Sequence, residues 1–562
     1  MSGYVLVVTD SEQASKLTAL FRAEETTTLP LEDGRTLVYV TNSGAISDGV
    51  IFQGYGIDHH AERMTFAGAS SGRTPDAATP LEGSYFTARI GAQQIRCGAD
   101  VYGFVPMVWT SGQTLTAVSD SYLTLIAMRR SLGLPCTPDE ETIRGRMWLN
   151  SMSLQQLGRE TYCREIRYAT PGTELRIGLS SGSVEERPLN LVDYYTGGFD
   201  SHADAVTVAA SRMVRTFKTY AETGGLTTLG LSGGTDSRVC LAAALAADMD
   251  ESLHVATRNN GSADYPIAVS LSERFGFPLN KQDPRVRGTV EKIDDAASWA
   301  GTSIGLYDAL YTPPGFSRRE LPVFSVGGQG AEISKGNFGW RPVTDIGMPT
   351  EGMDQSLRAL KVIGADPDDR WGSEWHYLAF RNAIHGGRAT LSSEYVARPA
   401  AQIPLIGLSR SALNDLPAPR KGAPSIVLDM LIKLSPELAS LPFDDQRKNA
   451  SAEYIAARLD RVGGPLDYAA LSPYAIAGSG RSSHGILGSH LDIAKAAGFT
   501  GNLDPTSLMP RVDVPFRHFH ELVPEVVRGW LDAINPSSVK RFGAAAREAG
   551  AVGKLLGLTT VM

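Results

Sequence analysis

Cysteine is scarce in this chain of 562 residues, and the four that occur, Cys97, Cys136, Cys163 and Cys240, form no CxxC pair. Such wide spacing argues against both a zinc ribbon and a disulfide framework. Lys and Arg number 53 against 61 Asp and Glu, so the formal net charge is −8 and the basic excess typical of a nucleic-acid-binding protein is missing. We therefore expect a cytoplasmic protein with no nucleic-acid partner.

Long apolar runs are missing too. No run approaches the roughly 18 residues that a membrane-spanning helix needs. The short N-terminal run Tyr4–Val8 follows no basic residue and is interrupted at Asp10, unlike a signal peptide. We expect no membrane partner, and the length allows two large units, each with its own core.

About the first 190 residues are rich in β-type patterns. Short apolar or alternating runs separated by turn-rich stretches are typical of packed antiparallel sheets. The predicted strands are Tyr4–Val8, Leu37–Val40, Ser84–Ile90, Phe104–Trp109, Leu115–Val118 and Glu174–Ile177, with one helix at Ser121–Leu132.

From about residue 201, alanine-rich helical patterns alternate with short apolar strands, which predicts a parallel α/β sheet. The predicted helices are Ala203–Glu222, Arg238–Ala247 and Tyr265–Phe275, and the predicted strands are Leu226–Leu231, Ser252–Ala256 and Val323–Val326. Beyond residue 400 the chain is mainly helical, with candidates at Ala452–Val462, Leu491–Ala497 and Phe519–Ile534. We place a domain boundary near residue 200.

A loop rich in glycine and hydroxyl groups joins the predicted strand Leu226–Leu231 to the helix that follows. It consists of Ser232, Gly233, Gly234, Thr235, Asp236 and Ser237. Glycines let the backbone turn sharply and present bare N–H groups, while the helix N-terminus adds positive potential, so the loop can cradle a polyphosphate. It lacks the GxxxxGK[ST] pattern of a Walker A loop.

This segment is identified as the SGGxDS signature of the PP-loop ATP pyrophosphatases, which cleave ATP between the α- and β-phosphates. The resemblance implies that the loop residues bind ATP together with Leu231, Val255 and Gly328. It also implies that Asp236 binds Mg²⁺. The alternative is a purely structural strand-to-helix turn that binds nothing.

A second glycine-rich segment follows the strand Val323–Val326. Gly328, Gln329, Gly330, Ala331 and Glu332 resemble the G-x-G-x-D segment of the asparagine synthetase branch, with Glu in place of Asp. The resemblance implies that Glu332 is the second Mg²⁺ ligand. Two carboxylates suit Mg²⁺, which takes its other ligands from nucleotide phosphates and water.

The N-terminal part resembles the glutaminase domain of asparagine synthetase-like proteins through loosely matching segments in the right order. These segments are Met1–Tyr4, Gly83–Ile90, Gly103–Trp109 and Glu160–Gly172. The resemblance implies an N-terminal-nucleophile hydrolase fold, an αββα antiparallel sandwich, over residues 1–195, and an α/β PP-loop synthetase domain with a mainly helical C-terminal part over residues 196–562. The family's nucleophile is a cysteine at position 2, where this chain has Ser2, so we expect an inactive glutaminase.

A synthetase signature without that cysteine looks like the β-lactam synthetase and lasso-peptide cyclase branches. The resemblance implies a ligase that uses ATP and Mg²⁺ to adenylate the carboxylate of a small molecule or peptide, after which an amine displaces AMP. Lactam or macrolactam formation in natural-product biosynthesis is the expected setting. A homodimer is among the expected partners.

Amide formation also needs a positive group near the developing oxyanion and an acceptor for the amine proton. By its place late in the chain, Lys448 matches the family's lysine, and Gln329 stands where the family has its base or a tyrosine. An amide accepts no proton at neutral pH, so Gln329 is expected to orient the substrate. The candidate bases are His385 and Glu394.

Three other functions remain open from the sequence. The first alternative is an amidotransferase of asparagine synthetase type that uses ammonia, or glutamine through Ser2. The second is a tRNA-modifying PP-loop enzyme. The third is a non-catalytic scaffold that kept the fold. The negative net charge and the β-rich first third disfavour the tRNA enzyme.

Overall fold

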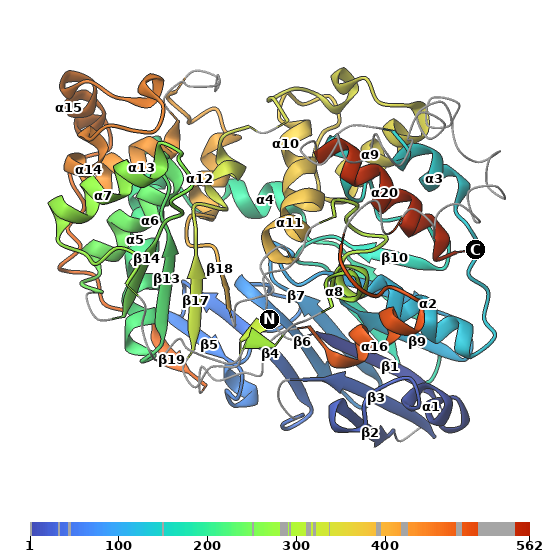
Figure 1. Ribbon diagram of the computed structural model, residues 1–562. Helices are drawn as coiled ribbons and strands as arrows, with labels where there is room; N and C mark the ends of the chain where they lie inside the picture. The colour runs from blue at the N-terminus through green and yellow to red at the C-terminus, as the bar shows by residue number, and fades with distance from the viewer. Residues whose placement is uncertain are drawn as a thin grey trace.

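The computed structural model describes residues 3–31, 34–42, 46–148, 151–249, 252–281, 290–291, 294–310, 316–317, 322–336, 338–388, 395–416, 425–478, 486–503, 508 and 546–561. In these ranges the chain is a mixed α/β protein with several sheets, as the sequence predicts (Figure 1). No helix among them is both long and apolar enough to cross a membrane.

Two large sheets occupy the lower part of Figure 1, and their strands come almost entirely from the first third of the chain. The first is antiparallel, with the strand order β10-β8-β9-β1-β3-β2. Its strands are β1 (Tyr4–Asp10), β2 (Thr26–Pro30), β3 (Arg35–Thr41), β8 (Met107–Ser111), β9 (Leu115–Ser119) and β10 (Ile166–Ala169).

The second large sheet has the order β12-β11-β7-β6-β4-β5-β19. Its strands are β4 (Val50–Asp58), β5 (Arg63–Phe66), β6 (Glu82–Ile90), β7 (Gln94–Ala99), β11 (Glu174–Gly178), β12 (Val184–Arg187) and β19 (Ala475–Ala477). The two sheets share one core, in which the ring of Tyr4 on β1 stacks on that of Phe86 on β6 with 3.7 Å between centroids.

The six strands predicted in this part are present, but the one predicted to begin at Phe104 begins at Met107. The buried carboxylate of Asp100 explains the shift. It accepts hydrogen bonds from the N–H groups of Phe104 and Val105 at 3.0 and 3.2 Å, which bends these residues into a turn. Burial raises the pKa of Asp100 to about 7.

The third sheet is parallel and has the order β14-β13-β17-β18. It consists of β13 (Leu226–Gly230), β14 (Leu253–Ala256), β17 (Val323–Val326) and β18 (Tyr395–Ala397). The register pairs Leu229 of β13 with Val255 of β14 and Val326 of β17, so the carboxyl ends of these strands lie along one edge. The predicted parallel sheet is confirmed, although the sequence patterns did not reveal β18.

Helices cover the sheets. Around the parallel sheet lie α5 (His202–Glu222), α6 (Thr235–Ala246), α7 (Asp264–Phe275), α12 (Ile403–Ser409), α13 (Ile426–Leu434), α14 (Pro436–Ser440) and α15 (Ala452–Arg461). The others are α1 (Ser11–Thr18), α2 (Tyr122–Ser131), α3 (Glu140–Arg146), α4 (Leu191–Thr196), α8 (Asp295–Thr302), α9 (Thr350–Val362), α10 (Gly372–His376), α11 (Ala383–Arg388), α16 (Gly488–Ala496) and α20 (Ala546–Thr559). The helix predicted at Phe519–Ile534 lies outside the described residues.

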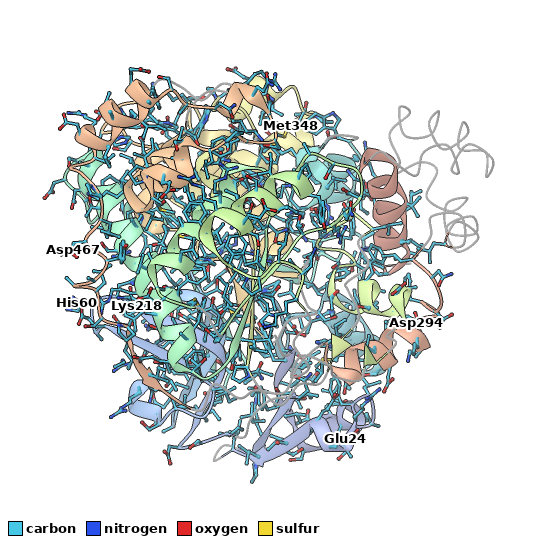
Figure 2. All side chains as sticks on the ribbon, turned by 60° about the vertical axis from the view of Figure 1, so that its left-hand side comes forward. Glu24, His60, Lys218, Asp294, Met348 and Asp467 are labelled. Atoms are coloured by element: carbon cyan, nitrogen blue, oxygen red, sulfur yellow. The ribbon has the colours of Figure 1, made fainter. Side chains whose placement is uncertain are left out.

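Segments from late in the chain pack on the N-terminal sheets. Strand β19 pairs in parallel with β5, and the ammonium of Lys218 on α5 donates to the carbonyls of Tyr468 and Leu471 just before it, at 2.9 and 2.7 Å. Figure 2 shows Lys218, His60 and Asp467 on the same flank. Helix α16 packs on α2 and α8. The limits 1–195 and 196–562 stay a prediction.

Candidate functional site

The loop after β13 leads into a helix whose first turn has no side-chain cap. Leu231 is buried and its N–H donates to the carbonyl of Ala256 at 2.8 Å, which continues the sheet. Gly234 then stands at the N-cap of α6 and offers no side-chain acceptor to the N–H groups that follow it. The first N–H groups of a helix have no partner within it, so this helix start is suited to bind an anion.

Hydrogen bonds hold the loop in shape. The hydroxyl of Ser237 accepts from the N–H of Ser232 at 2.9 Å and lies 2.9 Å from the hydroxyl of Ser232. Asp264, the first residue of α7, accepts from the N–H of Gly233 at 2.6 Å. The sequence analysis missed Asp264, although the start of the helix after the next parallel strand falls at the same sheet edge.

The second glycine-rich segment packs directly on this loop. An ideal Cβ on Gly328 would lie 2.6 Å from the Cβ of Asp236 and 2.7 Å from the N of Ser237, so only glycine fits. Gly330 has φ +102° and an ideal Cβ there would lie 2.9 Å from the N of Ala401. Gln329 lies between these two tightly packed glycines and is half-buried.

The two carboxylates predicted to bind a metal are near enough to affect each other. Glu332 accepts from the N–H of Gly330 at 2.5 Å. Burial raises the pKa of Glu332, and the negative charge of Asp236 raises it further. Asp236 also forms an ion pair with Lys335, a residue that the sequence analysis did not select.

The donor set fits Mg²⁺, because hard carboxylate oxygens at an uncapped helix start leave the remaining positions to phosphate and water oxygens. The described residues contain no group of three or more His, Cys, Asp or Glu side chains placed to hold a metal by themselves. Asp236 and Glu332 would therefore hold the ion jointly with the phosphates of a nucleotide.

Lys448 reaches the same loop from a distant part of the sequence. The N–H of Asp444 donates to the carbonyl of Gly233 at 3.0 Å, and Asp444 accepts from the ammonium of Lys448 at 2.8 Å. An ideal Cβ on Gly234 would lie 3.9 Å from that ammonium nitrogen. Lys448 is thus held beside the first turn of α6.

Arg238, one turn into α6, fixes the segment that leads to Lys448. Its buried guanidinium donates to the carbonyls of Leu438, Leu441 and Pro442 at 3.1, 2.8 and 2.6 Å. It also lies over the ring of Phe443, 3.9 Å from the centroid. Because Arg238 directly follows the SGGTDS loop, the two segments are positioned by one helix.

The structure does not place three other predicted site residues, His385, Val255 and Glu394, in contact with the loop. His385, on α11, has its Nδ1 atom 2.9 Å from the hydroxyl of Tyr307. Burial lowers the pKa of His385 to about 4, so it is neutral at pH 7 and a weak base. Val255 is buried in the core and its carbonyl accepts from the N–H of Asn280 at 2.8 Å. Glu394 lies outside the described residues.

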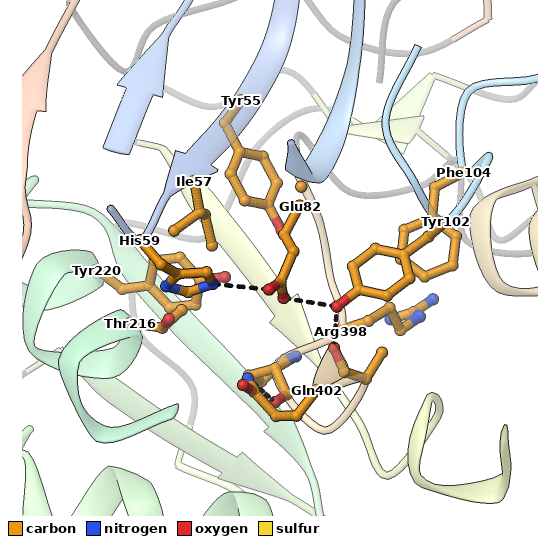
Figure 3. Close-up of a pocket in the computed structure, with 13 residues that line it drawn as sticks. Tyr55, Ile57, His59, Glu82, Tyr102, Phe104, Thr216, Tyr220, Arg398 and Gln402 are labelled. Carbon is orange, nitrogen blue, oxygen red and sulfur yellow. Dashed lines mark hydrogen bonds and ion pairs between the residues drawn. The ribbon is translucent and has the colours of Figure 1, made fainter. Parts of the chain in front are cut away.

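A second polar cluster, also missed by the sequence analysis, is centred on buried Glu82 at the start of β6 (Figure 3). His59 Nε2 lies 2.9 Å from Glu82 Oε1, Arg212 pairs with the same oxygen at 3.2 Å, and the hydroxyl of Tyr102 donates to Oε2 at 2.6 Å. Burial alone would raise the pKa of Glu82, but His59 and Arg212 lower it on balance.

Glu82 and His59 line two hollows. One of them, also lined by Arg398 and Gln402, has a volume of about 20 Å³, enough for one water molecule (Figure 3). The other has about 230 Å³ and is also lined by Tyr194 and Arg212. The sequence patterns did not reveal this cluster, because β4, which His59 follows, was not predicted and the predicted strand of β6 began two residues after Glu82.

No known protein family matches the chain, and none of the curated proteins is similar to it. The solved structures compared include the allosteric regulatory enzyme of purine biosynthesis, with 10% identity and a TM-score of 0.18 over 64% of this chain and 78% of that one. They also include the glutamine phosphoribosylpyrophosphate amidotransferase of B. subtilis complexed with ADP and GMP, with 10% identity and a TM-score of 0.18 over 59% and 77%.

Proposed function

We propose that the chain is an ATP- and Mg²⁺-dependent ligase that forms amide bonds through an acyl-adenylate. One observation carries the proposal: three segments that are far apart in the sequence meet at the carboxyl edge of the parallel sheet. These are the Ser232–Ser237 loop, the Gly328–Glu332 segment and the Asp444–Lys448 segment. A turn that binds nothing would not require such close packing of backbone around an uncapped helix start.

In the proposed first step, a substrate carboxylate oxygen attacks the α-phosphorus of ATP, and the bond to the β-phosphate breaks to release pyrophosphate. The N–H groups at the start of α6 hold the phosphates. Asp236 and Glu332 would hold Mg²⁺, which would neutralise negative charge on the phosphate oxygens. The ammonium of Lys448 lies beside the same helix start and can stabilise negative charge there.

In the second step, the amine nitrogen attacks the acyl carbon, the bond from that carbon to the phosphate oxygen breaks to release AMP, and the extra proton of the amine passes to water. Lys448 is the cation we assign to the negative charge that develops on the acyl oxygen and the departing phosphate. Gln329 donates hydrogen bonds that orient the substrate. The low pKa of His385 weighs against this residue as the proton acceptor.

We further propose that the N-terminal sheets form an N-terminal-nucleophile hydrolase sandwich whose glutaminase is inactive. Ser2 lies outside the described residues, but the next residue, Gly3, is buried. An ideal Cβ on Gly3 would lie 2.8 Å from the Cβ of Leu487 and 3.2 Å from the Cδ2 of His490. Helix α16 therefore covers the start of β1, which favours a structural role for this region.

The test is pyrophosphate release from ATP and Mg²⁺ with a panel of carboxylates, each with and without an amine. The expected result is release with at least one carboxylate, lost in Asp236→Ala. Release that is unaffected by Asp236→Ala would contradict the proposed site. Calorimetry showing no binding of ATP·Mg²⁺ would favour the scaffold, and glutamate release from glutamine would favour the amidotransferase.

A further inference from the structure

Lys335 contacts both residues whose carboxylates are predicted to hold Mg²⁺, one through its side chain and the other through its backbone. It follows the short 3₁₀ turn Ala331–Ser334, and its backbone N–H donates to the carbonyl of Glu332 at 3.0 Å. Its ammonium reaches across to pair with the Oδ1 atom of Asp236. One residue thus links the second glycine-rich segment to the first turn of α6.

The position of this ammonium is unusual for a structural lysine. Asp236 is the second residue of α6, where the helix dipole favours anions and disfavours cations. Both side chains are 31% exposed, and an ion pair at that exposure adds little to stability. Stability therefore does not account for the Lys335–Asp236 pair, and we look for its role in the binding of charged ligands.

Charged side chains of both signs surround the loop. The carboxylates belong to Asp236, Asp264, Glu332 and Asp444. The ammonium groups belong to Lys335 and Lys448, and the guanidinium groups of Arg398 and Arg238 act electrostatically on Glu332 and Asp444. Without Lys335, Asp236 and Glu332 would be a pair of like charges able to attract a divalent cation even in the absence of a nucleotide.

We propose that Lys335 is an internal counter-ion that occupies Asp236 until the nucleotide arrives, so that Mg²⁺ binds together with the nucleotide and not before it. This inference rests on the proposed function. Binding of Mg²⁺ to the carboxylate of Asp236 would repel the ammonium of Lys335, because the metal ion carries two positive charges. The flexible side chain of Lys335 would then turn to the phosphate oxygens. When pyrophosphate and the metal leave, Lys335 returns to Asp236.

The first test measures metal binding to the full chain without nucleotide, with Mn²⁺ as the probe and free Mn²⁺ followed by electron paramagnetic resonance. Lys335→Met removes the charge and keeps the length of the side chain, and it should bind Mn²⁺ at least tenfold more tightly than the wild type. Lys335→Arg keeps the charge and should stay within threefold of the wild type. Equal affinity of Lys335→Met and the wild type would overturn the inference.

The second measurement repeats the titration with an α,β-methylene analogue of ATP, which cannot release pyrophosphate. The analogue should raise the Mn²⁺ affinity of the wild type more than that of Lys335→Met, because coupling between two ligands is reciprocal. Normal binding of the analogue with no difference in this coupling would overturn the role of Lys335 alone. Failure of the analogue to bind any variant would overturn the proposed function as well.

A third experiment does not depend on the stability of Lys335→Met. Asp236→Asn frees the ammonium of Lys335 and removes a negative charge, so inorganic pyrophosphate in the presence of EDTA should bind at least fivefold more tightly than to the wild type. Adding Lys335→Met to Asp236→Asn should cancel the gain. Unchanged pyrophosphate affinity in Asp236→Asn would contradict a lysine that moves between carboxylate and phosphate.

Discussion

Gly328 offers the sharpest test of the site, because its neighbour Gly327 provides a matched control. An ideal Cβ on Gly328 would lie 2.6 Å from the Cβ of Asp236, whereas one on Gly327 would have no atom within 4 Å. Ordinary contact between carbon atoms is about 3.5–4.0 Å, so Gly328→Ala must push the second glycine-rich segment roughly 1 Å away from α6.

Overpacking of this kind costs about 1–3 kcal/mol, which corresponds to a roughly 5- to 150-fold weaker affinity if it is expressed where the nucleotide binds. We expect Gly328→Ala to bind ATP·Mg²⁺ more weakly by a factor in this range in calorimetric titrations, and Gly327→Ala to stay within twofold of the wild type. Circular dichroism of both variants checks that the fold is retained. Equal affinities of the two folded variants would refute the reasoning.

Three further predictions concern other parts of the molecule. Glu82→Gln removes the buried carboxylate that pairs with Arg212 and should lower stability by about 1–3 kcal/mol, and with it the thermal midpoint. Glu62→Gln, in a pair where Glu62 is 66% exposed, should barely change the midpoint. Equal midpoints of the two variants would contradict this. Burial lowers the pKa of Lys554 from 10.5 to about 7. Between pH 7 and pH 10.5, Lys554 is protonated in the unfolded chain but largely deprotonated in the folded one, so the free energy of unfolding should rise with pH in this range. Lys554→Met should remove this rise, measured by thermal unfolding at several pH values. Arg238→Met and Lys448→Met should each reduce amide formation at least tenfold, because Arg238 fixes the segment that holds Lys448. Unchanged amide formation in Arg238→Met, measured with a carboxylate that supports pyrophosphate release, would contradict this.

The sequence predicted the parallel sheet and the loop at its edge because both depend on local patterns. The run Leu226–Gly230 is short and mostly buried, the glycines come directly after it, and good helix formers follow. Strand, turn and helix N-terminus are each decided within a few residues, so the site's central loop could be found without knowing what packs against it.

The missed strands had weak local signals. Strand β4 contains Gly54 and Gly56, which interrupt the alternation, and Gly54 has φ +87°. Strand β19 has only three residues and pairs with β5, more than four hundred positions earlier in the chain. Pairing with this distant strand supplies the hydrogen bonds that make Ala475–Ala477 a strand, and no local pattern contains that information.

The missed site residues share the same cause. Asp264 and Asp444 bond to Gly233 only because α7 begins, and the segment after α14 passes, at the same sheet edge. Lys335 stands three residues after Glu332 and would be taken for an exposed lysine if its contact with Asp236 were not seen. Lys448 was found only through the resemblance, and the structure supplies the physical reason for its position in the hydrogen bonds of Arg238.

The charges of the site also limit how it can work. Beside the uncapped helix start, the carboxylates of Asp236 and Glu332 face one another, and the ammonium of Lys335 pairs with Asp236. A polyphosphate without a metal would therefore meet helix dipoles that attract it and carboxylates that repel it. A divalent cation held by Asp236 and Glu332 would turn these two carboxylates from repelling groups into ligands. The proposed ligase should then depend on Mg²⁺ for nucleotide binding itself, so that calorimetric titration with ATP in EDTA gives at least tenfold weaker binding than with Mg²⁺; equal affinity in both conditions would show that Asp236 and Glu332 do not face the phosphates.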